Sequence, residues 1–277
     1  MIENQRKGRK KLYIGFLDIR KAYDSVWRQG LWAKLQGLGF EGKMLLMLQA
    51  LYKDVKGTAE LGDLNSREVK MNKGLKQGCN LSPILFALYL KDLGEQLVES
   101  GEGVTVGDTK IPGLFFADDM AVMADSDTGL AKLLGIVDQY GKKWKFKLNG
   151  KKSKIMKTTR TQEGVKKWHI INDWIDEADE REVIIDEDED YKYLGVTVRI
   201  KGSIFGKQWQ TMVQKAKQME GMIYRESGRT SDKCYFGKVL WENVAIPTFL
   251  YGVEVVMTPE KIIQELEKIQ LRVGRWL

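Results

Sequence analysis

The stretch Leu114-Phe115-Phe116-Ala117-Asp118-Asp119-Met120-Ala121-Val122-Met123 places two adjacent carboxylates between two apolar runs. Two apolar runs joined by a short polar turn predict a β-hairpin whose turn carries the charge. Carboxylates beside apolar strands cost free energy unless a cation pairs with them, and Mg²⁺ binds carboxylate and phosphate oxygens. The hairpin therefore indicates a divalent-metal site, with an exposed acidic turn as the alternative.

Another carboxylate, that of Asp18, stands at the end of a different apolar run. Residues 12–19 predict a buried strand that is apolar until Asp18. A helix cap or an ion pair with Arg20 or Lys21 would also explain Asp18. We favour a metal site instead, which Asp18 would share with the carboxylates of the hairpin. Asp24, which precedes a helical pattern, is predicted to be a cap or turn residue.

Composition excludes several classes of protein. The 277 residues carry a net charge of +7, which suggests a polyanionic partner. The sequence has two cysteines, Cys79 and Cys234, and one histidine, His169. A disulfide framework, a zinc site and a histidine metal cluster are therefore not expected. No apolar run reaches the ~18 residues of a membrane span, and no signal peptide is recognisable. These features predict an intracellular, reduced protein, nuclear or cytoplasmic, that is neither secreted nor in a membrane.

A glycine-rich loop precedes the next predicted helix. The sequence Gly74-Leu75-Lys76-Gln77-Gly78 has a permissive backbone, and such a loop at a helix N-terminus can approach a phosphate or a base. An ordinary loop is the alternative. Ser82 is predicted to cap the helix with Pro83 at its first position, and the helix should end near Val98.

Basic residues dominate the segment from Lys142 to Arg160, which contains no acid. A charge run is usually a solvated face, but a run of one sign that interleaves Trp144 and Phe146 favours contact with a phosphate backbone. Its cations are Lys142, Lys143, Lys145, Lys147, Lys151, Lys152, Lys154, Lys157 and Arg160. Residues 173–190 are acidic instead and predict a surface loop with a short strand at 183–185.

Apolar periodicity predicts the remaining elements. Residues 42–53 predict a helix, with short strands near 57–62 and 66–71, a helix over about 128–146, and a strand at 191–198. Two helical stripes follow, one over residues 209–223 and one over residues 262–276, and we interpret both as helix-packing core. Their members are Trp209, Met212, Ala216, Met219 and Ile223, then Ile262, Leu266, Ile269, Val273 and Trp276.

Five stretches in this order resemble motifs A to E of reverse transcriptases. The Phe-Ala-Asp-Asp form of the hairpin resembles the non-LTR (LINE-type) retrotransposon branch, and residues 241–252 are similar to the thumb side of those polymerases. The stretches are Phe16-Leu17-Asp18-Ile19-Arg20-Lys21-Ala22-Tyr23-Asp24, Gly74-Leu75-Lys76-Gln77-Gly78, Phe116-Ala117-Asp118-Asp119, Leu148-Asn149-Gly150-Lys151-Lys152-Ser153-Lys154 and Tyr193-Leu194-Gly195.

This resemblance implies an α+β fold. Residues 1–200 would form a ferredoxin-like polymerase palm, an antiparallel sheet with helices on one face. Residues 201–277 would form a helical, thumb-like region. The family's fingers, which precede motif A, and its endonuclease region would lie on a longer parent protein.

The resemblance also implies roles for residues. Asp18 and Asp118 would hold two Mg²⁺ ions, for which Mn²⁺ can substitute, and Asp119 would ligate less directly. Tyr23 would be the steric gate that excludes a ribose 2′-hydroxyl. Gln77 and Gly78 would lie over the incoming nucleotide. Lys152 or Lys154 would be the general acid for pyrophosphate, and Tyr193, Leu194 and Gly195 would form the primer grip.

The implied activity is RNA-directed DNA polymerisation by two-metal transfer from a dNTP to a primer 3′-hydroxyl. Its partners would be an RNA template, a DNA primer and dNTPs, with Lys142, Lys143, Lys145 and Lys151 on the nucleic acid. One alternative is a fragment that binds nucleic acid without polymerising, because the fingers are missing. A nuclease or phosphotransferase that uses the same carboxylates is the other, which motifs B and E and Tyr23 disfavour.

Overall fold

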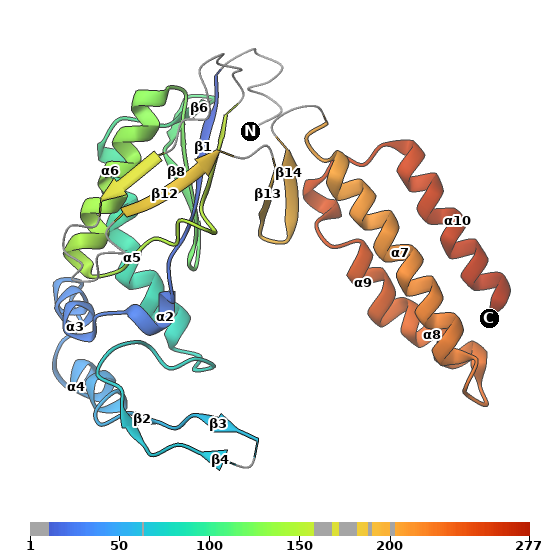
Figure 1. The fold of residues 1–277 in the computed structure, drawn as a ribbon, viewed down its shortest axis with the longest axis horizontal. Coiled ribbons are helices and arrows are strands. Elements are labelled where there is room, and N and C mark those ends of the chain that lie inside the picture. Colours follow the sequence, from blue (N-terminus) through green and yellow to red (C-terminus); the bar gives the residue numbers. More distant parts are fainter. Residues whose placement is uncertain (1–10, 63, 158–167, 172–181, 188–189, 200–202) are drawn as a thin grey trace. The chain divides into compact units, whose positions relative to one another are not determined.

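The computed structural model describes residues 11–62, 64–157, 168–171, 182–187, 190–199 and 203–277 (Figure 1). The described chain falls into two compact units, one that ends at residue 187 and one that begins at residue 190.

A six-stranded sheet forms the centre of the first unit, with the strand order β11-β12-β10-β1-β9-β8. All neighbouring strands are antiparallel except β10 and β12, which run parallel. The strands are β1 (Tyr13–Asp18), β8 (Gly113–Phe116), β9 (Asp119–Ala124), β10 (Lys154–Lys157), β11 (Trp168–Ile171) and β12 (Glu182–Glu187). The predicted strand at 183–185 is therefore a full member of the sheet.

Two helices, α5 (Ser82–Glu99) and α6 (Asp127–Trp144), cover one face of this sheet (Figure 1). The same core continues to α2 (Ala22–Ser25), α3 (Arg28–Gly37) and α4 (Gly42–Leu51), which lie beyond the end of the sheet. The chain runs β1, helices, β8, β9, α6, β10, and the corresponding strands lie in the order β10-β1-β9-β8, which is the ferredoxin-like β-α-β-β-α-β arrangement. The predicted α+β fold is confirmed.

Strand alternation divides the central sheet into two faces. Leu17 and Met120 belong to the core under the helices and are about 1% exposed. Their neighbours Phe16, Asp18 and Asp119 therefore point to the opposite face, because successive side chains along a strand alternate. The carboxylates lie on the face away from the helices.

A buried lysine joins three of the helices. Lys34 of α3 donates hydrogen bonds to Asp92 and to the carbonyl of Tyr89 on α5, and to the hydroxyl of Tyr140 on α6. Its ammonium group also lies 4.0 Å from the ring centre of Trp144. Burial lowers the pKa of Lys34 to about 8. This polar network fixes the end of α6, from which the chain continues toward Asp18.

Three short antiparallel strand pairs complete the described part of the first unit. Two of them follow one another along the segment between α4 and α5, and the third is a hairpin that precedes β8. Their strands are β2 (Lys56–Gly57) with β5 (Val69–Lys70), β3 (Glu60–Leu61) with β4 (Leu64–Asn65), and β6 (Val104–Val106) with β7 (Thr109–Ile111).

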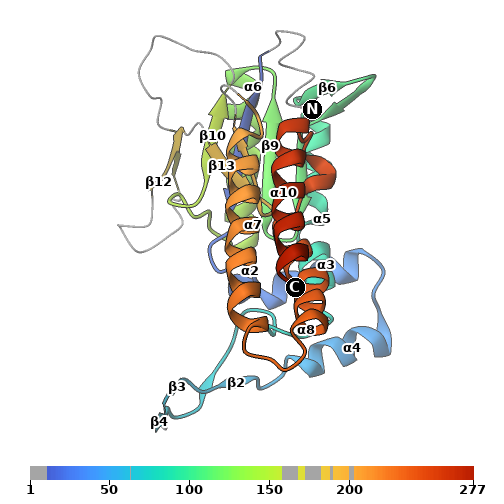
Figure 2. The same ribbon diagram turned by 90° about the vertical axis from the view of Figure 1, so that its right-hand side faces the viewer.

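The second unit consists of a hairpin and a helical bundle (Figure 2). Its core is formed by Ala216, Ile223, Trp241, Ala245, Phe249, Ile269 and Val273, so both predicted stripes contribute to packing. The elements are β13 (Asp190–Tyr193), β14 (Val196–Arg199), α7 (Gly206–Ser227), α8 (Lys233–Leu240), the π-helical segment Trp241–Ala245, α9 (Ile246–Phe249), the 3₁₀ turn Val253–Val255 and α10 (Glu260–Trp276).

Three predictions of local structure are wrong. Residues 191–198 form the hairpin β13–β14 rather than one strand, because Leu194 and Gly195 take left-handed φ values of 47° and 81° and reverse the chain. Ser82 does not cap α5; its buried hydroxyl donates to the carbonyl of Lys76 at 2.6 Å instead. Of the predicted cap or turn role of Asp24, the cap is wrong, because Asp24 lies inside the four-residue α2 and caps no helix.

Among the described residues, none of the helices combines the length and apolar character needed to cross a bilayer.

Candidate active site

The carboxylates of the two predicted motifs meet at one end of the sheet. Strands β1 and β9 pair antiparallel so that Asp18 lies directly across from Asp119. Directly opposed residues have Cβ atoms about 4.5–5.5 Å apart and share a face of the sheet. Asp118 precedes Asp119 in the two-residue turn between β8 and β9, since Phe116 pairs with Asp119.

The turn that carries Asp118 has an unusual backbone. Its first residue, Ala117, has a φ of +53°, in the left-handed region that favours glycine. The short two-residue connection requires this conformation because tight hairpin turns use positive φ.

These acids influence one another. Burial raises the pKa of Asp119, and the charges of Asp118 and Asp18 raise it further, while the ammonium group of Lys152 lowers it. The three carboxylates are therefore close enough to interact.

The donor set suits a hard divalent cation but does not enclose one. All three side chains offer carboxylate oxygens, which Mg²⁺ prefers. In the described part of the chain, no group of three or more His, Cys, Asp and Glu side chains is close enough to form a metal site by itself. Mg²⁺ in phosphate-transfer sites is commonly held by one or two carboxylates together with substrate oxygens. The residues fit a metal that binds with its substrate.

Backbone hydrogen bonds tie the loop before β10 to the end of β1. The amide of Asn149 donates to the carbonyl of Asp18 at 2.8 Å, and the amide of Asp18 donates to the hydroxyl of Ser153 at 3.1 Å. Ser153 is fully buried. This places Lys152 with its ammonium 3.9 Å from the Asp18 carboxylate, although its side chain is 70% exposed. Lys154, two residues after Lys152, is the first residue of β10 and pairs with Phe16 of β1.

The segment after β1 is held against the glycine-rich loop. The amide of Leu75 donates to the carbonyl of Tyr23 at 2.8 Å, and Gly74 approaches Asp24 so closely that a Cβ atom would lie 2.8 Å from the Asp24 carbonyl. The Tyr23 ring stacks on Phe86 of α5, with ring centres 5.0 Å apart. Gln77 donates from Nε2 to the carboxylate of Asp24 at 3.1 Å. The structure thus joins the predicted gate and the predicted nucleotide loop.

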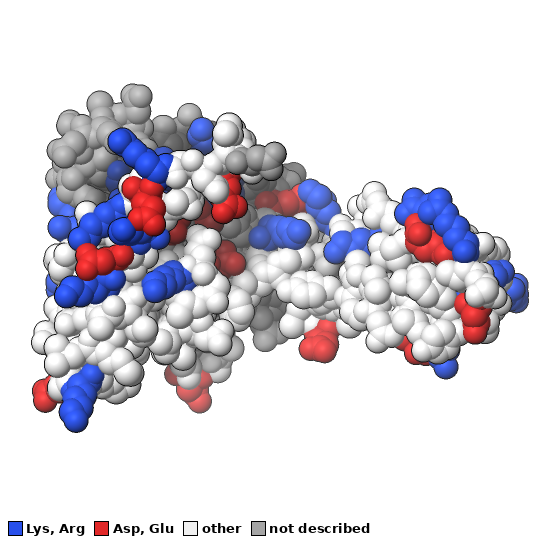
Figure 3. Space-filling view, turned by 90° about the horizontal axis from the view of Figure 1, so that it is seen from below, with Lys and Arg blue, Asp and Glu red and all other residues white. Residues whose placement is uncertain are grey.

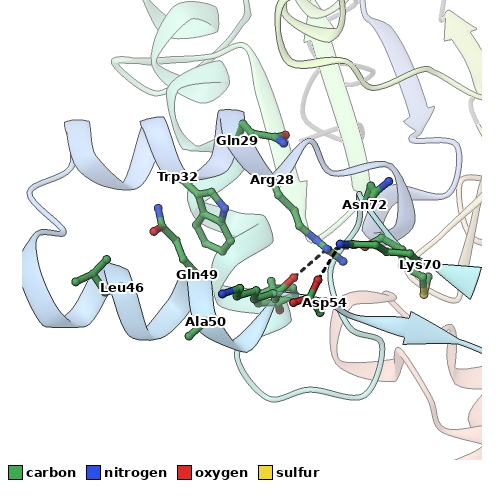
Figure 4. Close-up of a pocket in the computed structure, with 12 residues that line it drawn as sticks. Arg28, Gln29, Trp32, Leu46, Gln49, Ala50, Asp54, Lys70 and Asn72 are labelled. Atoms are coloured by element: carbon green, nitrogen blue, oxygen red, sulfur yellow. Dashed lines mark hydrogen bonds and ion pairs between the residues drawn. The ribbon is translucent and has the colours of Figure 1, made fainter.

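A buried arginine secures the base of that loop. Arg28, only 8% exposed, donates to the carbonyls of Gly74 at 2.8 Å, Met71 at 2.7 Å, and Tyr52 and Lys73 at 3.2 Å each. It lines a cavity of about 640 Å³ between α3, α4 and residues 70–72 (Figure 4). Burial lowers the pKa of the guanidinium.

The basic run has exposed lysines but buried aromatics. Lys142, Lys143 and Lys145 are exposed, whereas Phe146 is 3% exposed and Trp144 packs against the helical core. The two aromatic residues are therefore core residues, and the contact of the basic run with phosphates depends on its exposed lysines. On the face seen in Figure 3, cations lie among acids and beside broad uncharged areas. Arg160 lies outside the described residues.

The predicted primer-grip residues form the tip of the β13–β14 hairpin in the second unit. The hydroxyl of Tyr251 donates to the Leu194 carbonyl at 3.0 Å. Gln208 of α7 accepts from the amide of Thr197 at 3.0 Å. Tyr251 and Ser153 lie in stretches that the sequence analysis singled out, but it missed their contacts and those of Arg28. The partners of all three are distant backbone atoms that no periodic pattern indicates.

Comparison with known proteins agrees with the motifs. The family described as "Reverse transcriptase (RNA-dependent DNA polymerase)" has a model that matches residues 2–198. The "Retrovirus-related Pol polyprotein from type-1 retrotransposable element R2" of Popillia japonica is 34% identical over 154 residues, which is 55% of this chain and 22% of that protein. The "RNA-directed DNA polymerase from mobile element jockey" of Drosophila melanogaster is 23% identical over 95% of this chain and 28% of its own length.

A solved structure of apo telomerase from Candida tropicalis is also similar, with a TM-score of 0.48 and 12% identity over 99% of this chain and 48% of that one. The chain spans about a quarter of the length of the two retroelement proteins.

Proposed function

The chain belongs to the reverse transcriptase family, and we propose that it is the RNA-directed DNA polymerase domain of a non-LTR retrotransposon protein. The observation that carries the proposal is the register that brings Asp18 opposite Asp119, with Asp118 beside it and Lys152 3.9 Å from Asp18. Residues 1–200 would act as the palm and residues 201–277 as a thumb. Its substrates would be dNTPs and a DNA primer on an RNA template.

Asp18 and Asp118 would hold two divalent cations together with substrate oxygens, and Asp119 would ligate less directly. These cations would stabilise the attacking 3′-oxygen and the leaving pyrophosphate. Lys152 would donate a proton to pyrophosphate. Its exposed ammonium group beside Asp18 makes it a better candidate than Lys154, which is part of β10 and further along the sheet.

Tyr23 and the loop at residues 74–78 would select the nucleotide. The Tyr23 ring is held by Phe86 and by the hydrogen bond from Leu75 to its own carbonyl. A ring fixed in this way would collide with a ribose 2′-hydroxyl. Gln77 would contact the nucleotide while Asp24 orients its carboxamide.

The exposed lysines of the basic run would contact phosphates. Each phosphate neutralised contributes about −0.9 to the slope of log K against log salt on B-DNA. Replacing Lys142, Lys143 and Lys145 together by Gln should make this slope less steep. Because Lys145 lies 4.3 Å from the Trp27 ring centre and Lys143 5.4 Å from the Trp144 ring centre, their loss should also cost some stability. Melting curves control for that effect.

Primer extension on an RNA template tests the proposal. The relatives are several times longer than this chain, so we expect residues 1–277 to bind primer-template and to extend it weakly, and a longer parent protein to extend it well. Tyr23→Val should then admit ribonucleotides. Extension that survives Asp118→Asn, or a Tyr23→Val protein that still rejects ribonucleotides, would contradict the proposal.

A further inference from the structure

The tip of the β13–β14 hairpin has a backbone that its own sequence does not favour. Leu194 and Gly195 both have positive φ, at 47° and 81°. Two consecutive residues of this kind form the tight turn that joins adjacent antiparallel strands. Glycine adopts the left-handed region freely, but leucine does so rarely. Contacts from elsewhere in the chain must stabilise the turn.

Tyr251 supplies the first of these contacts. Its hydroxyl donates to the carbonyl of Leu194 at 3.0 Å, across 57 residues of sequence. Its ring occupies the space beside Gly195, because a Cβ atom at Gly195 would lie 2.5 Å from the ring carbon Cε1. Tyr251 remains 54% exposed, so burial of its ring in a core does not explain its position.

Gly252 supplies the reciprocal contact. It also has a positive φ, at 81°, and a Cβ atom there would lie 2.6 Å from Cγ2 of Val196. Each segment therefore needs a glycine where the side chain of the other approaches. The turn at residues 194–195 and the turn at residues 251–252 fit together as one unit.

We propose that Tyr251 is a positioning residue, which holds the Leu194–Gly195 turn in the one conformation that it offers to the primer strand. The inference rests on the proposed function, in which this hairpin is the primer grip. The Tyr251 ring fills the space beside Gly195, so the turn cannot change its conformation on that side. The Tyr251 hydroxyl fixes the orientation of the Leu194 peptide through its hydrogen bond to the carbonyl. A primer terminus would then meet a preorganised turn, which lowers the ordering cost of binding.

The test uses Tyr251→Phe, which keeps the ring and removes the donor. Tyr224→Phe is the matched control, because the Tyr224 hydroxyl donates at 2.9 Å to Glu220 within the bundle of the same unit. Glu220 keeps its two bonds from Arg272 in that variant. Amide hydrogen exchange over residues 190–199 reports the turn, and the affinity for a primer-template with a recessed 3′ end reports its role.

We expect Tyr251→Phe to speed exchange at the hairpin about five- to tenfold, as the loss of one hydrogen bond implies. It should weaken primer-template binding about threefold or more, while binding to a blunt duplex changes little. Tyr224→Phe should leave both the exchange of residues 190–199 and the affinity unchanged. If exchange at the hairpin is unaltered in Tyr251→Phe, the proposal is overturned. Faster exchange with unaltered affinity would equally overturn the positioning role.

A double-mutant cycle checks the role of the ring. Gly195→Ala should speed hairpin exchange strongly in the unaltered chain and less in a Tyr251→Ala background, because the collision is then absent while the strain of positive φ remains. Equal effects in both backgrounds would overturn the proposed contact. If the unaltered chain does not prefer a recessed primer end, the proposed function of the hairpin fails instead, and hydrogen exchange still decides whether Tyr251 holds the turn.

Discussion

The carboxylate end of the sheet and the helical bundle are stabilised in different ways. At the end of β1, the loop around Asn149 and Ser153 is held by hydrogen bonds to the backbone of Asp18. Burial and the charges of Asp118 and Asp18 raise the pKa of Asp119 there. In the bundle, an apolar stripe on α7 packs against one on α10, and Glu220 accepts two hydrogen bonds from Arg272 at 2.7 Å each.

Because the two regions are stabilised differently, we expect substitutions in them to affect stability and activity separately. Crowded carboxylates at the sheet end oppose folding slightly and, in the proposed function, would bind a cation. Packed residues of the bundle and of the palm core serve stability. Substitutions in the first region should therefore change chemistry without unfolding the chain, and substitutions in the second should do the reverse.

The largest effect is expected at Asp118. Asp118→Asn keeps the size of the side chain and removes a charge that the proposed metal binding requires. Nucleotide incorporation should therefore fall by about a thousandfold or more, which corresponds to roughly 4 kcal/mol. The melting temperature should stay the same or rise, since Asp119 loses a repulsive neighbour. Single-nucleotide extension and thermal unfolding measure the two quantities.

Asp108→Asn is the control for that substitution, because Asp108 is an exposed acid in the turn between β6 and β7. It should change neither activity nor melting. Loss of folding in Asp118→Asn would show that the carboxylate is structural, and it would contradict the expected separation of activity from stability at the sheet end.

Core substitutions should show the opposite behaviour in each unit. Leu93→Ala in α5 and Ile223→Ala in α7 both truncate side chains with 0% exposure, and each should lower the free energy of unfolding by about 2–5 kcal/mol. If the two units unfold separately, each substitution should shift only its own calorimetric transition. A single transition that both substitutions shift equally would show that the units are thermodynamically coupled.

Much of both regions could be predicted from the sequence because periodicity reports which face of an element is buried. Asp18 and the Asp118-Asp119 pair were recognisable as acids beside apolar strands, and the stripe on α10 was recognisable by its spacing. The register that places Asp119 opposite Asp18 was not, because a shift of two residues keeps every side chain on its face of the sheet and so leaves the apolar pattern unchanged.

Contacts to distant backbone atoms also escaped prediction. Arg28 donates to four carbonyls, three of which lie 43 to 46 residues away, and Tyr251 reaches the carbonyl of Leu194. No local pattern indicates such partners. Positive φ at Leu194 and Ala117 was equally hidden, since neither residue type signals it.

A smaller effect is expected on the stability of the β13–β14 hairpin as the pH is lowered. Hydrogen bonds from Arg199, at 2.5 and 3.0 Å, and from Lys207, at 2.9 Å, lower the pKa of Asp190 to about 2. A carboxyl with a folded-state pKa below its ordinary value of about 3.9 stabilises the fold above that pH, and the contribution is lost as the pH falls from about 4 toward 2. Because Arg199 is 41% exposed, solvent screening limits the contribution to about 1 kcal/mol.

Asp190→Asn should therefore be less stable than the unaltered protein at pH 7 and nearly equal to it at pH 2, as measured by urea unfolding at each pH. Glu254→Gln, which alters an exposed carboxylate of the same unit, should leave the stability unchanged at pH 7. An Asp190→Asn deficit that is the same at both pH values would show that the ion pairs are not its cause.

The smallest effect tests the backbone of the turn that carries Asp118. Ala117 is exposed and has a φ of +53°, a conformation that costs an L-residue about 1–2 kcal/mol and glycine very little. Ala117→Gly should relieve this strain, but glycine also gains freedom in the unfolded chain, so the net stabilisation should be about 0.5–1 kcal/mol. Ala131→Gly makes the same chemical change at an exposed position inside α6, where it should destabilise by about 1 kcal/mol. Opposite signs for the two substitutions, measured by urea unfolding, would establish that the turn is strained.

If the Ala117→Gly protein is also less active on a primer, the strain contributes to placing Asp118, and the separation of stability from activity at this end of the sheet extends to the backbone. Equal destabilisation by both substitutions would mean that the turn favours alanine for a reason other than its φ.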